Sequence, residues 1–256
     1  MITIKSNREI ELMRESCFIV AKAHEEIKKA IKVGVSTKSL DKIAEDVILS
    51  YGAIPSFKNY PSGFKNVKNY PAATCISIND EIIHGIPSDK RIIEDGDIVS
   101  IDIGAYKNGF HGDCARTHII GEVSPDEKKL VEVTKQSFFE GIKFAKPGYR
   151  IGDISNAIGE FIYKNGFGVV EEFQGHGVGR DLHEDPGIPN YGKKGSGPRL
   201  EVGMTLAIEP MVNMGTKNVL ILEDGWTTVT EDRKKSAHYE NTILITQKEA
   251  EILTKL

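Results

Sequence analysis

Apolar residues recur at the three- and four-residue spacing of an amphipathic helix near the start of the chain. The first such segment covers residues 7–31, and Ser6 or Asn7 can cap its first turn. A second segment of the same kind follows Gly34 and ends at Gly52. The pattern therefore predicts two consecutive helices joined by a short turn.

The same arrangement recurs later in the chain. Residues 124–127 are typical of a helix start, because proline is favoured in the first helical turn. Two helical segments follow, and the second lies between Gly148 and Gly166, which are 18 residues apart. Gly34 and Gly52 are also 18 residues apart. The recurrence favours an internal duplication over two unrelated helix pairs.

Segments of β-strand character follow each predicted helix pair. They cover residues 74–78, 98–103 and 110–120 after the first pair, and 204–208, 220–222 and 239–246 after the second. No proline- or serine-rich linker separates the two sets, so we expect one α+β domain over residues 1–256. Its two halves, approximately residues 7–122 and 124–250, are expected to face one another across a shared sheet. The glycine- and proline-rich stretch 187–199 predicts a surface loop.

Composition and charge narrow the class of protein without indicating a chemistry. The formal net charge of −4 argues against a protein that binds nucleic acid by neutralising phosphates. The cysteines, Cys17, Cys75 and Cys114, form no pair motif, which predicts a reducing, cytoplasmic compartment. No apolar run is long enough to span a membrane, and the first residues lack the apolar core of a signal peptide. We therefore expect a soluble intracellular protein.

Four carboxylates lie in or beside apolar strand segments, at Asp102, Asp113, Glu209 and Glu240. Each needs a cation or a proton, because burying an unpaired charge is costly. Asn108-Gly109 strongly predicts a two-residue hairpin turn, and this turn would pair Asp113 with Gly104. Since side chains alternate along a strand, Asp102 and Asp113 would then be diagonal neighbours on one face of the hairpin. Two carboxylates this close either share a proton or bind a metal.

The histidines favour the metal. His176 lies in the glycine-rich segment 175–179, where the backbone can pack closely beside a site. Oxygen ligands with one imidazole suit Mn, Fe, Co or Zn. Four carboxylates would balance two divalent ions, and two such ions would activate a bridging water and polarise a carbonyl. His84 precedes a turn, and from its spacing alone a solvent-facing side chain is the ordinary expectation.

Five segments together resemble the type I methionine aminopeptidases of the pita-bread metallopeptidase family. They are residues 75–87 (CISINDEIIHGIP), 96–122 (GDIVSIDIGAYKNGFHGDCARTHIIGE), 175–189 (GHGVGRDLHEDPGIP), 203–213 (GMTLAIEPMVN) and 236–246 (SAHYENTILIT). They stand in the family's order, and the resemblance covers essentially the whole chain. It implies a pita-bread fold, in which two pseudo-symmetric α+β halves surround a curved antiparallel sheet.

The resemblance also implies roles for individual residues. The metal ligands would be Asp102, Asp113, His176, Glu209 and Glu240, with Asp113 and Glu240 bridging two divalent ions (Co, Mn, Fe or Zn). Glu209 would double as the proton shuttle for a hydroxide that bridges the ions. His84 would contact the substrate near the scissile amide, and His183 would hydrogen-bond its carbonyl and stabilise the oxyanion.

The methionine pocket implied by the resemblance includes Tyr70, Cys75, Leu182 and Trp226. Leu182 stands where relatives can carry Phe, which leaves the shape of the pocket open. Trp226 follows Glu223-Asp224-Gly225 in an apparent turn, a position that is equally typical of a side chain that only anchors a loop.

The implied activity is removal of the initiator methionine from nascent chains whose second residue is small. The resemblance also implies a cytoplasmic monomer that binds N-terminal methionine peptides, and it is compatible with transient association with the ribosome. The alternatives within the fold are a proline-directed peptidase, of the prolidase or aminopeptidase P type, and a non-catalytic binding module. The former usually carries a sizeable N-terminal domain, and the latter should lack ligand positions. His183 and Glu209 are only 26 residues apart, which leaves no room for the insertion of type II relatives.

Overall fold

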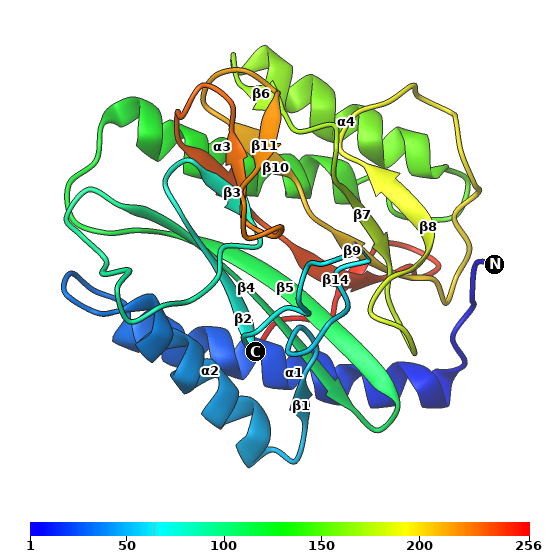
Figure 1. The fold of residues 1–256 in the computed structure, drawn as a ribbon. Helices are drawn as coiled ribbons and strands as arrows, with labels where there is room; N and C mark the ends of the chain where they lie inside the picture. Colours follow the sequence, from blue (N-terminus) through cyan, green and yellow to red (C-terminus); the bar gives the residue numbers. More distant parts are fainter. Residues whose placement is uncertain (64) are drawn as a thin grey trace.

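The computed structural model describes residues 1–63 and 65–256. Its helices are α1 (Asn7–Ala30), α2 (Thr37–Ser50), α3 (Pro125–Ile142) and α4 (Ile151–Lys164). All four predicted helices are therefore confirmed. The α1–α2 pair and the α3–α4 pair lie on opposite sides of the molecule, with the strands between them (Figure 1).

The first helix of each pair begins with the same device. At α1, the Ser6 hydroxyl accepts a hydrogen bond from the backbone of Glu9, whose side chain accepts one from the backbone of Ser6. Ser124 and Glu127 form the equivalent capping box at α3, with Pro125 in the first turn. Each box satisfies backbone donors that the helix itself leaves free. Because the capping residues lie within a few positions of one another, the two helix starts can be predicted from the sequence.

Four antiparallel sheets connect the helix pairs. The strands are β1 (Ile54–Pro55), β2 (Thr74–Ile78), β3 (Glu81–Ile83), β4 (Ile98–Lys107), β5 (Phe110–Ile119), β6 (Gly168–Val169), β7 (Gln174–Gly177), β8 (Glu184–Pro189), β9 (Thr205–Ile208), β10 (Met211–Asn213), β11 (Val219–Ile221), β12 (Thr228–Thr230), β13 (Ser236–His238), β14 (Asn241–Leu244) and β15 (Glu251–Ile252). One sheet has the order β1-β4-β2 with β5 beside β4, and another has the order β15-β14-β9-β7-β8. The predicted strand over 239–246 is replaced by β13 and β14, with Tyr239 and Glu240 between them.

The hairpin of β4 and β5 has the register that its turn predicts. Gly104 lies opposite Asp113, and Asp102 lies opposite Ala115. The turn residues Asn108 and Gly109 both have positive φ, at 53° and 89°, as a tight hairpin turn of this type requires. Asp102 and Asp113 are therefore diagonal neighbours on one face, as expected.

The predicted loop over 187–199 is wrong at its start. Residues 187–189 belong to β8, where Gly175 of β7 pairs with Ile188 and Gln174 pairs with Pro189. Gly187 lies in this paired strand, beside the side chain of Gln174. Residues 191–199 are exposed, as predicted.

Two apolar cores lie beneath the helix pairs. One joins Ile19, Val20, Ile27 and Leu40 of α1 and α2 to Val99, Ile101 and Ile103 of β4. The other joins Leu130, Phe138, Ile154 and Ile158 of α3 and α4 to Leu206, Ile208 and Ile243 of β9 and β14. Each helix pair thus covers one face of a sheet and leaves the other face available for the site.

The internal duplication stays a prediction. No helix in the described residues is both long and apolar enough to cross a membrane.

Candidate metal centre

A cavity of about 830 Å³ lies at the meeting point of the β4–β5 hairpin and the sheet that contains β7, β9 and β14. We call it the main cavity. All the site residues expected from the sequence line it: Tyr70, Cys75, His84, Asp102, Asp113, His176, Leu182, His183, Glu209, Trp226 and Glu240. Residues that are up to 170 positions apart in the sequence, from Tyr70 to Glu240, are thus brought to one place.

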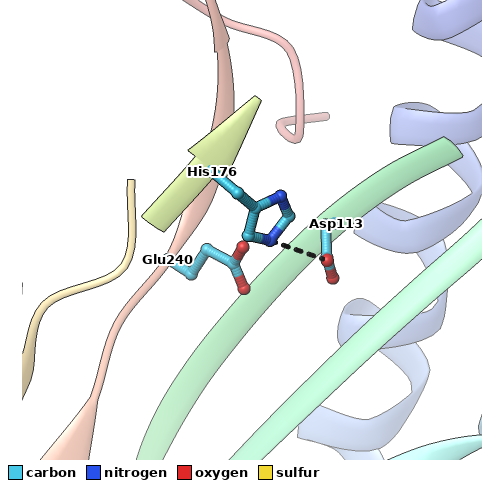
Figure 2. Close-up of side chains that lie close together, drawn as sticks. All are labelled: Asp113, His176 and Glu240. Carbon is cyan, nitrogen blue, oxygen red and sulfur yellow. Dashed lines mark ion pairs between the residues drawn. The ribbon is translucent and has the colours of Figure 1, made fainter. Parts of the chain in front are cut away.

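Three of these residues form the tightest cluster. Asp113, His176 and Glu240 each offer one ligand atom, and these atoms lie within 4.8 Å of one another. Figure 2 shows the three side chains pointing toward one another from three separate segments. His176 Nε2 lies 3.9 Å from Asp113 Oδ2 and 3.6 Å from Glu209 Oε1. Asp102 joins through the hairpin, as the diagonal neighbour of Asp113 on the paired strand.

The pairing of β9 with β14 determines where Glu209 and Glu240 lie. Ile208 of β9 lies opposite Asn241 of β14, so Glu209 and Glu240, one residue beyond each, meet at the same end of the pair. The backbone N–H of Glu240 donates to the carbonyl of Ala115 on β5, at 3.0 Å. The break between β13 and β14 therefore serves to place the Glu240 carboxylate in the main cavity.

His176 is oriented as a metal ligand would be. Its Nδ1 lies 2.8 Å from the carbonyl oxygen of Gly177, which can only accept a hydrogen bond. The ring proton is thereby held on Nδ1, and Nε2 presents its lone pair to the carboxylates. Burial lowers the pKa of His176 to about 3, so this imidazole is neutral at physiological pH.

The carboxylates are crowded and lack cationic side chains. Burial raises the pKa of Asp102 to about 7 and that of Glu209 to about 8. Burial, and then repulsion from neighbouring carboxylates, raises the pKa of Asp113 and of Glu240 well above the ordinary range. Among the described residues, none of the four forms an ion pair with Lys or Arg.

Several oxygen atoms in this group have no hydrogen-bond partner. They are Asp102 Oδ1, Asp113 Oδ1 and Glu240 Oε1, each buried and unpartnered within the described chain. Leaving buried polar atoms unpaired costs free energy that native proteins rarely incur without a purpose. Hard or borderline divalent cations prefer this donor set of carboxylates and one imidazole. The residues present therefore fit a metal site.

His84 and His183 line the same cavity as the carboxylates. The ring of His84 makes edge-to-face contacts with Phe173 and Trp226, at 5.8 and 6.1 Å between centroids, and burial lowers its pKa to about 4. It is part of the cavity wall and not simply a solvent-facing loop residue. The ring of His183 lies 4.3 Å from that of His176.

Two residues in contact with the site were not predicted. The Tyr60 hydroxyl lies 2.6 Å from His183 Nδ1, across 123 residues of sequence. His238, which is buried, places Nε2 3.4 Å from Glu209 Oε2. The segment around Tyr60 has no periodic pattern that would mark it. His238 does lie two residues before Glu240, so alternation along an extended chain was a signal that could have been used.

One wall of the main cavity is apolar. Tyr70, Cys75 and Leu182 are buried there with Phe57 and Ala72. Cys75 lies directly opposite Asp102 in the pairing of β2 with β4, so the apolar wall adjoins the carboxylates. Trp226 packs edge-to-face on Tyr70 at 5.2 Å, while its indole N–H donates to the carbonyl of Lys68. Trp226 therefore both lines the cavity and anchors a loop.

An α+β fold with a buried cluster of carboxylates and one oriented imidazole defines a metal-dependent hydrolase. A family model for metallopeptidase family M24 matches residues 11–247. The chain belongs to this family.

Individual relatives agree over the full length. The chain is 54% identical to methionine aminopeptidase 1 of Bacillus subtilis, with 100% of both chains covered. It is 51% identical to the methionine aminopeptidase of Clostridium acetobutylicum, with 99% of both covered. The crystal structure of methionine aminopeptidase from Thermotoga maritima superposes with a TM-score of 0.96 at 46% identity, covering 100% of each chain.

A prolidase provides the contrast. The prolidase from Pyrococcus furiosus matches with a TM-score of 0.79 at 28% identity, and the match covers 99% of this chain but 65% of the prolidase. These neighbours share the pita-bread fold, so the predicted fold class is confirmed.

Proposed function

We propose that this metallopeptidase removes the N-terminal methionine from polypeptides whose second residue is small. The proposal rests on one observation: the carboxylate cluster with His176 and an apolar wall beside it line the same cavity. The full-length likeness to methionine aminopeptidases supports it.

The proposed cofactor is a pair of divalent ions, of Co, Mn, Fe or Zn, held by Asp102, Asp113, His176, Glu209 and Glu240. Four carboxylates carry four negative charges, which two divalent ions balance. When bound, the ions supply a Lewis acid and an activated water nucleophile. Metal analysis of the purified chain should then give two equivalents.

The remaining groups bind and orient the substrate. An unbranched methionine side chain suits the wall formed by Tyr70, Cys75, Leu182 and Trp226, because its thioether is apolar and flexible. If the Tyr60 hydroxyl donates to Nδ1 of His183, the proton of His183 resides on Nε2. That N–H can then donate to the carbonyl oxygen of the scissile bond as negative charge develops on it.

Proton transfer is assigned to Glu209. In the metal-free chain burial raises the pKa of Glu209 to about 8, and bound cations would favour its ionised form. An ionised carboxylate beside the attacking water can take a proton from it and return that proton to the leaving amine. His84, which lines the same cavity, is assigned to contact with the substrate near the scissile amide.

The test uses Asp113→Asn and Glu240→Gln, with Asp89→Asn and Glu249→Gln as exposed matched controls. Loss of Met-Gly-Met hydrolysis together with loss of bound metal in the first two, and in neither control, supports the proposal. Hydrolysis that persists after the metal is removed contradicts it. Faster cleavage of an Xaa-Pro peptide than of Met-Gly-Met would show a proline-directed peptidase instead.

The proposal includes the setting in which such an enzyme acts. We place it in the cytoplasm as a monomer that meets nascent chains, with transient association at the ribosome. The three cysteines are free and buried, which is compatible with a reducing compartment. Sedimentation of the purified chain at the mass of one copy would support the monomer. The two pseudo-symmetric halves of residues 7–122 and 124–250 belong to the proposal as well.

A further inference from the structure

A second cavity, of about 580 Å³, lies behind the metal centre. We call it the back cavity. It is lined by side chains of α1, β5 and α3 and by residues 252–256. Arg116 and His118 line it from β5, and since side chains alternate along a strand, they lie on the opposite face of that strand from Asp113. The two cavities have no lining residue in common, although His238 of the back cavity lies 3.4 Å from Glu209 of the main cavity.

The back cavity gathers basic side chains that have no acidic partner. Lys28, Arg116, Lys135 and Lys255 line it, and none of them forms an ion pair among the described residues. The one side-chain carboxylate in the lining is Glu25. It already pairs with Lys22 and Lys29, at 2.9 and 3.6 Å. The cavity thus carries a local excess of positive charge in a chain whose formal net charge is −4.

Arg116 is fixed in place by uncharged acceptors. Its Nη1 donates to the carbonyls of Ala115 and Glu240, and its Nη2 donates to Asn241 Oδ1 at 2.6 Å. Its guanidinium lies over the ring of Tyr239, 4.6 Å from the centroid. A further bond from Nη2 to the carbonyl of Thr254, at 3.5 Å, completes the use of the Nη donors. Among the described residues the positive charge of Arg116 has no carboxylate partner, so Arg116 would offer an anion this charge and its Nε–H.

A buried donor in the lining is also unused. Asn241 is 1% exposed, and its Oδ1 accepts hydrogen bonds from Arg116 and from the Thr254 hydroxyl. Its Nδ2 has no hydrogen-bond partner in the described part of the chain. An amide nitrogen that is buried without an acceptor is costly, and an anion oxygen would satisfy it.

The surrounding imidazoles respond to the same positive charge. Burial, and then the charges of Arg116 and Lys28, lowers the pKa of His118 to about 4. Burial and Arg116 also lower the pKa of His24. These rings are neutral at physiological pH, so the positive charge of the cavity comes from the arginine and the lysines.

We propose that the back cavity binds a small molecule that carries a phosphate group. A volume of about 580 Å³ is typical of small-molecule sites. The phosphate would contact Arg116 and the three lysines, and the apolar part of the ligand would lie on Val131, Tyr239 and Ile252. A nucleic acid is disfavoured because the basic groups line a hollow and the chain as a whole is acidic.

The test measures binding of phosphate to the full-length chain by isothermal titration calorimetry. Chelator-treated protein is used, because phosphate would otherwise also bind metal ions in the main cavity. Without ions, the cluster of Asp102, Asp113, Glu209 and Glu240 in that cavity would repel an anion. We expect saturable binding at one site. Phenyl phosphate should bind more tightly than inorganic phosphate, because its ring can reach the apolar wall.

The decisive variant replaces Lys28, Lys135 and Lys255 with Gln. All three side chains are exposed, so the fold should persist. We expect phosphate affinity to fall at least about tenfold, as each exposed charge near the anion contributes a small but additive attraction. The matched control replaces Lys32, Lys164 and Lys248, which are exposed and lie outside the cavity lining, with Gln.

Two results would overturn the proposal. One is the absence of saturable phosphate binding to the parent chain. The other is an equal loss of affinity in both triple variants, which would show a general response to net charge. Neither result depends on peptidase activity, so the proposed function and the back cavity succeed or fail separately.

Discussion

Removing the metal from this chain should make its stability fall as the pH rises from 7 to 8. The cause is the carboxylate cluster. A carboxyl group whose pKa is higher in the folded than in the unfolded chain keeps a proton that the unfolded chain releases. Its contribution to stability is complete below the unfolded pKa, about 4 for Asp or Glu, and is lost as the pH rises through the folded pKa.

The size of the effect follows from two groups. Asp102 has a folded pKa of about 7 and Glu209 one of about 8. Averaged between pH 7 and pH 8, the two together hold about one proton that the unfolded chain lacks, which corresponds to a loss of about 1.4 kcal/mol over that interval. The raised pKa values of Asp113 and Glu240 act in the same direction.

The histidines oppose this effect in part. In the unfolded chain, where each has a pKa of about 6.5, the seven together still hold about 0.7 proton on average between pH 7 and pH 8, and the raised pKa values of Asp113 and Glu240 act against this contribution. The pKa of every histidine is lowered by burial: His24, His84, His111, His118, His176, His183 and His238. A lowered pKa removes stability mainly as the pH falls below the unfolded value of about 6.5. Metal-free protein should therefore be most stable near pH 6.5 to 7 and weaken on both sides.

The assay is urea unfolding of chelator-treated and metal-loaded protein at several pH values. Metal-loaded protein should lose little stability from pH 7 to pH 8, because its carboxylates are already ionised. Glu240→Gln should reduce the slope of the metal-free chain, whereas exposed Glu249→Gln should not. A metal-free chain whose unfolding free energy stays constant or rises from pH 7 to pH 8 would refute the reasoning.

Three further substitutions probe single contacts. Tyr60→Phe removes the hydroxyl at His183 Nδ1; kcat should fall about fivefold in steady-state assays, as expected for one hydrogen bond, and an unchanged kcat would contradict the assigned role. Leu182→Ala shortens a side chain of the buried apolar wall and leaves a space there. KM for Met-Gly-Met should rise, and the unfolding free energy should drop by about 2–5 kcal/mol. An unchanged KM would show that Leu182 does not contact the substrate. Ser124→Ala removes the cap that pairs with Glu127; thermal denaturation should show a loss of about 1 kcal/mol, and no loss would mean that the cap is replaced.

Local signals explain what could be predicted from the sequence. The two helix starts depend on serine, proline and glutamate within a few residues, and the structure has both capping boxes. The placement of Asp102 beside Asp113 depends only on a two-residue turn and on strand alternation. Charge balance among four buried carboxylates, together with His176, suggests a two-metal site from the residues alone, whereas the role of each residue as a ligand comes from the family resemblance.

Contacts between distant segments explain what was missed. Tyr60 contacts His183, which is 123 residues away in the sequence, and no sequence pattern near Tyr60 predicts that contact. The stretch at Gly187 has the composition of a loop, yet β7 provides a partner strand and turns it into β8. In both cases the deciding neighbour is supplied by the tertiary fold, which composition and periodicity do not encode.

The placement of the five acidic and imidazole groups on separate strands has a consequence for how the chain is held together. Asp102 and Asp113 belong to β4 and β5, whereas His176, Glu209 and Glu240 belong to the segment from β7 to β14. An ion shared between these segments closes a loop of more than 100 residues, since 127 positions separate Asp113 from Glu240. Because the ion would be held only where the fold brings these segments together, its binding would stabilise the folded chain relative to the unfolded one. The cofactor would therefore stabilise the contact between distant segments of the chain. In cells short of metal, the protein would be less stable to unfolding as well as inactive.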